Sequence, residues 1–168
     1  MSKPSMKTAI FLDATLPIGV AGNTGIHLAT QYGAMRPDVA GPPVRDAAGE
    51  EHSGIPVWPN VVLAVSAKDL GVIIAQAREL AAIHSDVLVL DYPEAGFTTS
   101  TDDEYRTAMQ SAMPNSITYF GCLIHGPRKQ VDRATKGVGT QLWGNHGQGA
   151  CINDTQKGGV GPTNPELY

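Results

Sequence analysis

Acidic and hydroxyl side chains follow the first and third apolar runs of the chain, and they are its first candidates for chemistry. Asp91 comes directly after residues 87–90, and a carboxylate at a strand end is suited to position a water, act as a general base or bind an amine. Asp13 and Thr15 follow the first run, residues 7–12. Open α/β sheets place their ligand sites at the carboxyl ends of strands. The alternative for all three residues is an ordinary turn, which aspartate and threonine also favour.

A histidine and a cationic segment follow the fourth apolar run, residues 117–124. His125 comes directly after that run, and an imidazole exchanges protons near neutral pH, so it is a candidate for catalytic proton transfer. Arg128 and Lys129 come next and would attract the anionic part of a substrate. The alternatives are a histidine packed in the core and a solvated cationic helix face.

Two further pairs of polar residues are candidates for substrate binding. Asn23 and Thr24 lie in the first turns of a predicted helix, where they would donate hydrogen bonds to a substrate carbonyl or else face the core or the solvent. Thr98 and Thr99 belong to a hydroxyl-rich loop after the third predicted strand. They would serve the same site or take part in capping the next helix.

Residue types that bind zinc occur near the end of the chain. Cys122 and His125 are three positions apart, and His146 and Cys151 follow them. Cysteine and histidine are the usual ligands of zinc, but strand positions three apart point to opposite faces of a sheet. We therefore expect neither a metal site nor a cofactor, and we predict that Cys122 is a core residue.

The composition is that of a globular domain. The chain has 168 residues, of which 42% are apolar and 17% charged, which suits a single core and excludes a disordered chain. We expect one domain over residues 1–143 and a Gly-rich tail over residues 144–168. The net charge of −4 argues against a dedicated nucleic-acid-binding protein, since such proteins are usually basic. No stretch has the length of a transmembrane helix and the N-terminus lacks a signal-peptide core, so we expect a cytoplasmic protein without a membrane partner.

Strands and helices alternate in the pattern of an α/β domain. The predicted strands cover residues 7–12, 61–65, 87–90, 117–124 and 140–143, and the predicted helices cover residues 20–32, 67–84, 102–113 and 128–136. Ser66 and Thr101 precede two of these helices, each with an acidic residue three positions later, which is the pattern of a capping box.

Small residues in the first predicted helix indicate how it packs. A helix face of small side chains can lie close to a sheet, so we expect Ala21, Gly22, Gly25 and Ala29 on the inner face, with Ile26 beside them. Residues 36–54 are rich in proline, glycine and charge. They predict a long surface loop that contains a short hairpin.

Four segments make the sequence similar to a known family. They are Asp13-x-x-Leu16-Pro17-x-Gly19, His27-Leu28-Ala29, the strand end at Asp91, and His125-Gly-Pro-Arg-Lys129 followed by Val131-Asp132 and Thr135-Lys-Gly137. On these segments the chain resembles the DUF2000 family, small bacterial proteins of unknown function that are related in fold to the type 2 peptidyl-tRNA hydrolases. The resemblance covers residues 6–143. It implies a three-layer α/β sandwich, with a four-stranded mixed sheet and helices on both faces.

The resemblance also implies where a site would lie. The type 2 hydrolases cleave the ester between a peptide and tRNA, and they use a lysine at the start of the first helix, an aspartate after the third strand and a nearby threonine. In this sequence the lysine position falls on Val20 and the aspartate position on Asp91. The acid of that site is therefore present and its cation is absent.

These observations together predict a small enzyme or enzyme relative that hydrolyses or transfers an acyl- or aminoacyl-type substrate. Its cleft would lie between residues 13–24, 91–101 and 125–129, with Asp91 and His125 as catalytic groups. The alternative is a non-catalytic module that binds a small ligand or forms a dimer. We expect a small-molecule partner, with tRNA as an alternative, and a homo-oligomer, specifically a homodimer.

Overall fold

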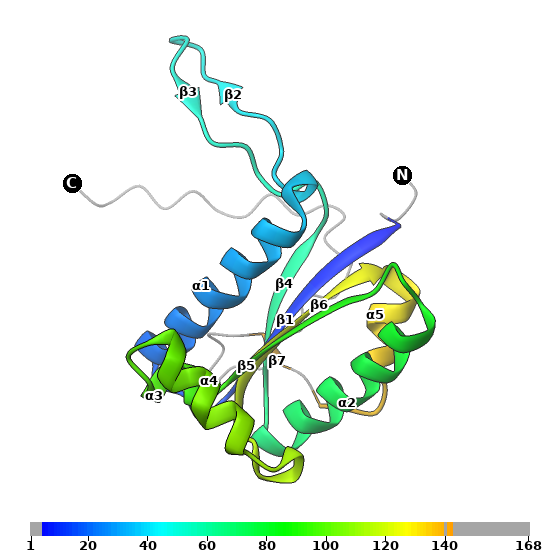
Figure 1. The fold of residues 1–168 in the computed structure, drawn as a ribbon. Helices are drawn as coiled ribbons and strands as arrows, with labels where there is room; N and C mark the ends of the chain where they lie inside the picture. Colours follow the sequence, from blue (N-terminus) through cyan, green and yellow to red (C-terminus); the bar gives the residue numbers. More distant parts are fainter. Residues whose placement is uncertain (1–4, 140, 143–168) are drawn as a thin grey trace, which may run out of the picture.

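A mixed β-sheet lies at the centre of the protein, whose computed structural model describes residues 5–139, 141 and 142 (Figure 1). Its four longer strands are β1 (Met6–Asp13), β4 (Asn60–Val65), β5 (Leu88–Pro93) and β6 (Tyr119–Pro127), and the two-residue β7 (Gln141–Leu142) joins one edge. The order is β5-β6-β1-β4-β7. β1 and β4 are parallel, whereas β6 runs antiparallel to both β1 and β5. The predicted α/β class and mixed sheet are confirmed.

β6 shows why an apolar run without polar alternation forms a central strand. It pairs with β1 on one side and β5 on the other, so its peptide groups are hydrogen-bonded on both edges. The two sides of the strand also both meet apolar side chains: Cys122 and Ile124 belong to one buried cluster and Leu123 to another. A strand covered in this way has no face that benefits from polar residues.

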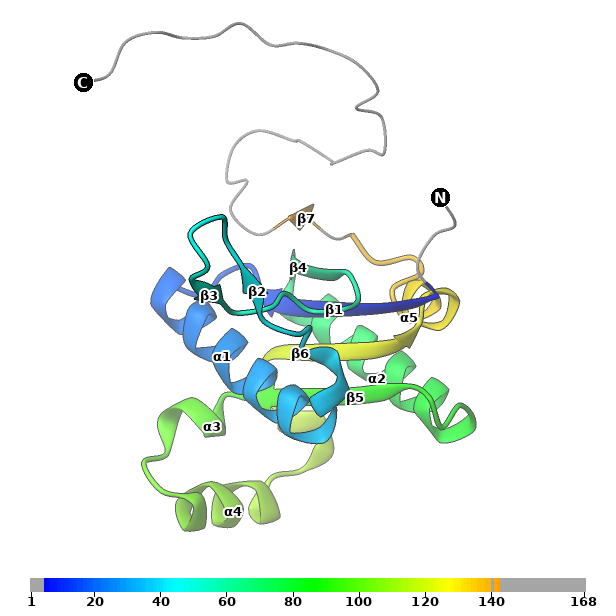
Figure 2. The same cartoon turned by 90° about the horizontal axis from the view of Figure 1, so that it is seen from above.

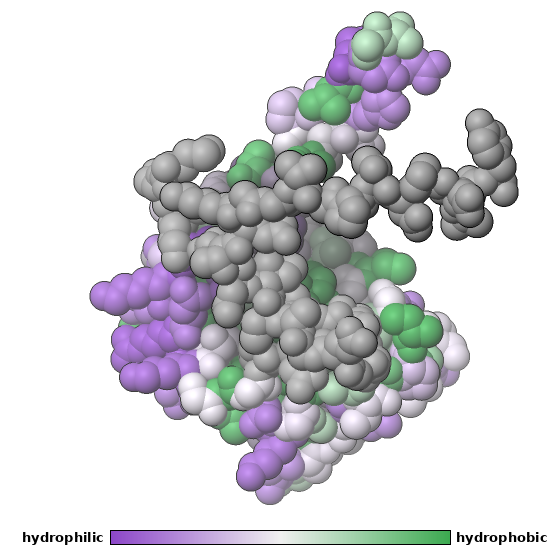
Figure 3. All heavy atoms as spheres, turned by 180° about the vertical axis from the view of Figure 1, so that it is seen from behind, coloured by the Kyte–Doolittle hydropathy of each residue, from purple (hydrophilic) through white to green (hydrophobic). Residues whose placement is uncertain are grey.

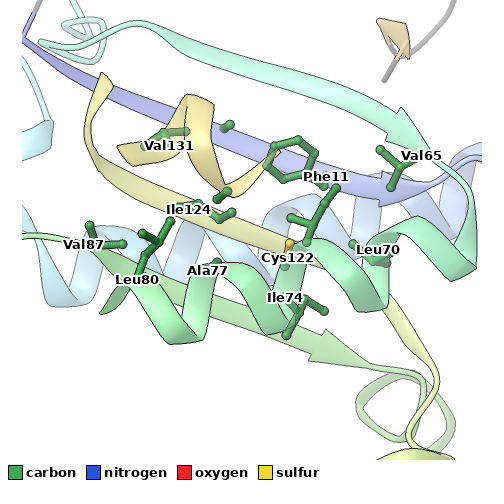
Figure 4. Close-up of a cluster of buried hydrophobic side chains, with 13 residues drawn as sticks. Phe11, Val65, Leu70, Ile74, Ala77, Leu80, Val87, Cys122, Ile124 and Val131 are labelled. Atoms are coloured by element: carbon green, nitrogen blue, oxygen red, sulfur yellow. The ribbon is translucent and has the colours of Figure 1, made fainter. Parts of the chain in front are cut away.

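Helices pack on the two faces of the sheet (Figure 2). The long helix α1 (Ile18–Met35) contributes Leu28 and Tyr32 to a cluster with Leu123 on one face. On the other face lie α2 (Ala67–Ile83) and α5 (Arg128–Ala134). Figure 4 shows this second cluster, in which α2 packs against strand residues such as Phe11. Burial of these apolar side chains from water is the main source of stability in such a core.

The inner face of α1 agrees with the prediction at Ala21 and differs from it at the other predicted residues. Gly22, Ala29 and Ile26 are exposed and Gly25 is half-buried. The residues that face the sheet are Ala21, Thr24, Leu28 and Tyr32. Leucine and tyrosine remove more apolar area from water than glycine or alanine, so the helix turns these larger side chains inward. The other small residues instead form part of its outer surface.

The N-terminal caps of two helices are confirmed. The Ser66 hydroxyl accepts a hydrogen bond from the Asp69 backbone at the start of α2. Thr101 and Glu104 form a reciprocal capping box at the start of α4 (Asp102–Ser111). A short helix that the sequence did not predict, α3 (Ala95–Thr98), connects β5 to this cap.

The Pro- and Gly-rich segment forms a hairpin that projects from the body of the protein (Figure 1). After the 3₁₀ turn η1 (Pro37–Val39), strands β2 (Val44–Arg45) and β3 (Glu51–His52) pair antiparallel, which confirms the predicted hairpin. At its base Gly41 and Gly54 lie so close that a Cβ on either would overlap the backbone opposite. Hydrophilic side chains gather along this arm (Figure 3).

The remaining predictions about the chain are tested only in part. A second 3₁₀ turn, η2 (Pro114–Ser116), precedes β6. The last predicted strand is present as β7, and Thr140 and Trp143 at its predicted ends lie outside the described residues. The predicted tail over residues 144–168 also lies outside them. None of the helices in the described part of the chain is long and apolar enough to cross a membrane.

Candidate functional site

A cavity of about 740 Å³ lies between α1, the end of β5, α3 and the start of α4. Figure 2 shows how this arises: α3 and α4 lie beyond β5, at the edge of the sheet opposite β7. The polar and aromatic side chains that line the cavity are Asn23, His27, Gln31, Asp91, Tyr92, Phe97, Thr99, Ser100, Thr101, Asp102 and Tyr105. We call this cavity the β5-edge pocket.

β5 supplies two polar side chains of the pocket, and they point in opposite directions because strand residues alternate between faces. Tyr92 packs with α1. Its hydroxyl donates to the Gly96 carbonyl at 2.7 Å, and the His27 ring stacks on its ring at a centroid distance of 4.8 Å. Burial raises the pKa of Tyr92, although a hydrogen bond with Asn23 partly opposes this. Tyr92 is therefore a neutral, fixed part of the wall.

Asp91 lies on the α2 side of β5, where it forms an ion pair. Arg78 of α2 donates from Nη2 to Asp91 Oδ2 at 2.6 Å, and its guanidinium lies over the Tyr119 ring. Tyr105 of α4 is close by: burial raises the pKa of its hydroxyl, and the charges of Asp91 and Asp102 raise it further. Asp91 thus reaches the pocket as a carboxylate that is already engaged on one oxygen.

Three of the residues predicted for the site meet in this pocket. Asn23, Asp91 and Thr99 all line it, from α1, β5 and the turn before α4. The Thr99 hydroxyl also donates to the Ala95 carbonyl at 2.7 Å. Thr98 is exposed, bonds to the Glu94 carbonyl and is not among the lining residues.

Three other predicted residues lie near this end of the sheet but outside the pocket. Thr24 is fully buried against Gly121, and its hydroxyl finds no hydrogen-bond partner among the described residues. Asp13 accepts hydrogen bonds from the backbone N–H and the hydroxyl of Thr15, both at 2.9 Å. Asp13 and Thr15 therefore form an ordinary turn, which was the alternative to a role in ligand binding.

His125, Arg128 and Lys129 lie at the opposite end of the sheet. In the antiparallel pairing of β6 with β1, His125 stands opposite Thr8 near the start of β1. The structure therefore does not bring residues 125–129 into one cleft with Asp13 and Asp91. The rule that places sites at strand ends holds for parallel strands, and β6 runs the other way.

His125 belongs to a buried polar cluster. Its Nδ1 atom lies 2.8 Å from the Tyr32 hydroxyl and 3.0 Å from the Thr8 hydroxyl, while Nε2 has no partner among the described residues. The Trp58 ring covers it at a centroid distance of 5.4 Å. Burial lowers the pKa of His125, so the ring is neutral. This is the packed histidine that was the alternative to proton transfer.

The two cationic residues after His125 are located on α5. The Arg128 backbone N–H donates to the Ser5 carbonyl at 2.9 Å, which joins the start of α5 to the start of β1. Lys129 is exposed to solvent.

Cys122 is fully buried and its thiol pKa is raised by burial, so it is a core residue as predicted. Over the described residues, no group of three His, Cys, Asp or Glu side chains is arranged to hold a metal ion. His146 and Cys151 of the zinc pattern lie outside that part of the chain.

Sequence reasoning missed the aromatic half of the pocket. His27 was not a predicted site residue, yet it is exposed and stacks on Tyr92. Phe97 and Tyr105 follow the third strand, where the loop was considered only for its hydroxyl groups. Their position in the sequence could have indicated them, because loop residues that follow a strand with a candidate site residue at its end often belong to the same site.

Comparisons with known proteins give a family and a structural relative. Residues 6–142 match the family model described as "Protein of unknown function (DUF2000)". A solved structure of a protein of unknown function, Atu0240 from Agrobacterium tumefaciens strain C58, is similar with a TM-score of 0.71 and 27% sequence identity. The similarity covers 83% of this chain and 98% of that one. No curated protein matches the sequence.

Proposed function

This chain belongs to the DUF2000 family, and we propose that it binds a small organic molecule in the β5-edge pocket. The observation that carries this proposal is the cavity itself. Its volume of about 740 Å³ falls within the range of roughly 300–1,000 Å³ that is usual for small-molecule sites. Its walls combine aromatic rings with a few polar groups, which is also usual for such sites.

Different elements supply complementary contacts for such a ligand. Asn23 of α1 offers an amide, Thr99 and Ser100 offer hydroxyl groups before α4, and Phe97 offers a ring that is 46% exposed. A planar or apolar part of the ligand would pack on this ring, and its polar part would reach the amide and hydroxyl groups. The walls come from a helix and a strand fixed in the core, so the site is largely formed before binding.

The test is to fill the pocket and observe whether binding is lost. Ser100→Trp places a large ring at a lining position, and Thr98→Trp places the same ring at an exposed position two residues away that does not line the pocket. A library of small aromatic and aliphatic amides, alcohols, amines and acids is titrated into each ¹⁵N-labelled protein. We expect ligand-induced shifts at pocket amides in the wild type and in Thr98→Trp, but not in Ser100→Trp. Equal binding by both variants would contradict the proposal.

A second candidate function is hydrolysis of a small acyl or aminoacyl ester on a fold like that of the type 2 peptidyl-tRNA hydrolases. It is favoured by the meeting of Asn23, Asp91 and Thr99 in one pocket. Asp91 would position the attacking water, and Asn23 would donate to the carbonyl oxygen. None of the described lining residues is a lysine or arginine, which favours a small substrate over tRNA.

Asp91→Asn tests this second function. Ester hydrolysis is followed with p-nitrophenyl acetate and with aminoacyl ethyl esters, with Asp103→Asn as the control, because Asp103 is exposed and does not line the pocket. We expect turnover by the wild type and the control but not by Asp91→Asn. The same rate in all three proteins would remove Asp91 from any mechanism.

The predicted homodimer remains a proposal, and α1 is the surface that supports it. No charged residue occurs between Ile18 and Met35. Ile26 is exposed on the outer side of α1, and Ile18 and Met35 are exposed at its two ends. The space above Gly22 is open, so a second helix is able to approach closely there.

A further inference from the structure

We propose that the ligand of the β5-edge pocket is an organic cation, such as a substituted ammonium group carried on a small molecule. This inference rests on the proposed function, since it names the chemical class that the same pocket selects. The argument uses the charges of the lining residues, their ion pairs and the aromatic rings around them.

The charged groups that line the pocket are of one sign. Asp91 and Asp102 line it, and no lysine or arginine is among the described lining residues. An anion that entered would meet two carboxylates, whereas the arginines that pair with them do not line the pocket. A cation would be attracted by both, and this attraction is stronger in a partly enclosed site than in open water.

Each carboxylate retains an oxygen for a ligand. Arg78 bonds Asp91 through Oδ2, and Arg106 bonds Asp102 through Oδ2, both at 2.6 Å. In the described part of the chain, Oδ1 of either residue makes no further hydrogen bond. The side chains of Arg78, Arg106 and Asp102 are all more than half exposed, so solvent screens both ion pairs, and Asp91, at 26% exposure, is the more enclosed of the two carboxylates.

Tyr105 lies within the electrostatic reach of both carboxylates. Besides burial, the nearby charges of Asp91 and Asp102 raise the pKa of its hydroxyl. Both carboxylates therefore act on the same region of the pocket, although one comes from β5 and the other from α4. The field that opposes ionisation of Tyr105 stabilises a positive charge placed beside it.

Aromatic rings supply the second element of cation recognition. Tyr105 and Phe97 line the pocket together with His27 and Tyr92. The faces of phenol and benzene rings attract ammonium groups, and the attraction is worth roughly 0.5–2 kcal/mol. Rings combined with carboxylates thus select a cation that is itself partly apolar. A metal ion is a poor fit, because the described residues contain no group of three His, Cys, Asp or Glu ligands.

The experiment compares two molecules of the same shape that differ in charge. Choline and its neutral isostere 3,3-dimethylbutan-1-ol are titrated into the ¹⁵N-labelled full chain, and benzyltrimethylammonium is used as a larger cation. We expect both cations to shift the amides of Gly96, Thr99 and Tyr105. Choline should bind about two- to thirtyfold more tightly than the alcohol, and added sodium chloride should reduce this preference.

Two variants locate the effect. Asp102→Asn should reduce the preference for choline over the alcohol. Asp103→Asn is the control, because Asp103 is an exposed charge in the same first turn of α4 that does not line the pocket. This control should leave the preference unchanged. Thermal melting of both variants verifies that α4 is intact. If the alcohol binds as tightly as choline, the charge inference is wrong and the pocket remains a ligand site. If no cation, alcohol or library fragment shifts the pocket amides, the proposed function is wrong as well.

Discussion

His125 makes the stability of the protein depend on pH, and replacing it should remove that dependence. Its ring is fully buried, with Nδ1 bonded to Tyr32 and Thr8. The substitution His125→Phe keeps a ring of similar size and removes the group that titrates. It also removes Nε2, which is a buried polar atom without a partner among the described residues.

The sign of the effect follows from the lowered pKa. Burial keeps the folded-state pKa of His125 below its ordinary value of 6.5, so the unfolded chain binds a proton at a higher pH than the folded chain does. The stabilisation is present above pH 6.5 and is lost as the pH falls toward the folded-state pKa. The limiting slope is about 1.4 kcal/mol per pH unit.

Loss of the hydrogen bonds at neutral pH should have a smaller effect. The Tyr32 and Thr8 hydroxyl groups lie 3.0 Å apart, so each keeps a partner when the imidazole is absent. Net hydrogen bonds contribute about 1 kcal/mol each, and removal of the unpaired Nε2 offsets part of the loss. We expect His125→Phe to change the free energy of unfolding by no more than about 2 kcal/mol at pH 7.5.

Urea unfolding at pH 7.5, 6.5 and 5.5, followed by circular dichroism, measures both effects. Tyr32→Phe is the matched control, because it removes a hydroxyl from the same cluster and leaves the imidazole in place. We expect the control to be less stable but to keep the pH slope of the wild type. A pH slope in His125→Phe as steep as that of the wild type would refute the assignment of this dependence to His125.

Three further outcomes follow from single contacts. Arg78→Met should reduce the free energy of unfolding by less than about 1 kcal/mol, because Arg78 is largely exposed in its ion pair with Asp91. The same substitution should tighten choline binding, because it removes the cation that competes for Asp91. Gly121→Ala should destabilise by about 1–3 kcal/mol in urea unfolding, because its Cβ would lie 2.8 Å from α1 and β1 side chains, whereas Gly22→Ala, which faces open space, should not. Ile26→Glu should convert any dimer to monomer in sedimentation velocity, and an unchanged sedimentation coefficient would exclude this face of α1.

Local features of the fold were predictable because neighbouring residues determine them. The apolar runs became strands, and Ser66 and Thr101 became helix caps. The direction of β6 was not predictable, because it depends on which strands it joins, and a buried strand has the same apolar pattern in either direction. This one long-range property separates His125 from Asp91.

Residues of the β5-edge pocket were predictable only where a strand end or the resemblance indicated a position. Asp91, Asn23 and Thr99 do line one pocket. The inner face of α1 was predicted correctly only at Ala21. The prediction relied on small residues, whereas the larger Leu28 and Tyr32 form much of that face. Tyr105 lies on a half-buried helix position, and a sequence does not distinguish a tyrosine that lines a cavity from one that fills it.

The two glycines at the base of the projecting hairpin allow the hairpin to be replaced by another segment. Gly41 and Gly54 bring the outgoing and returning chains into contact, so the body of the protein is already closed below the arm. Residues 42–53 are exposed, and their removal takes nothing from the core. A short turn or a foreign peptide with adjacent ends is therefore suited to replace them. This position is a grafting site where the protein can be tagged or displayed without altering the sheet or the pocket.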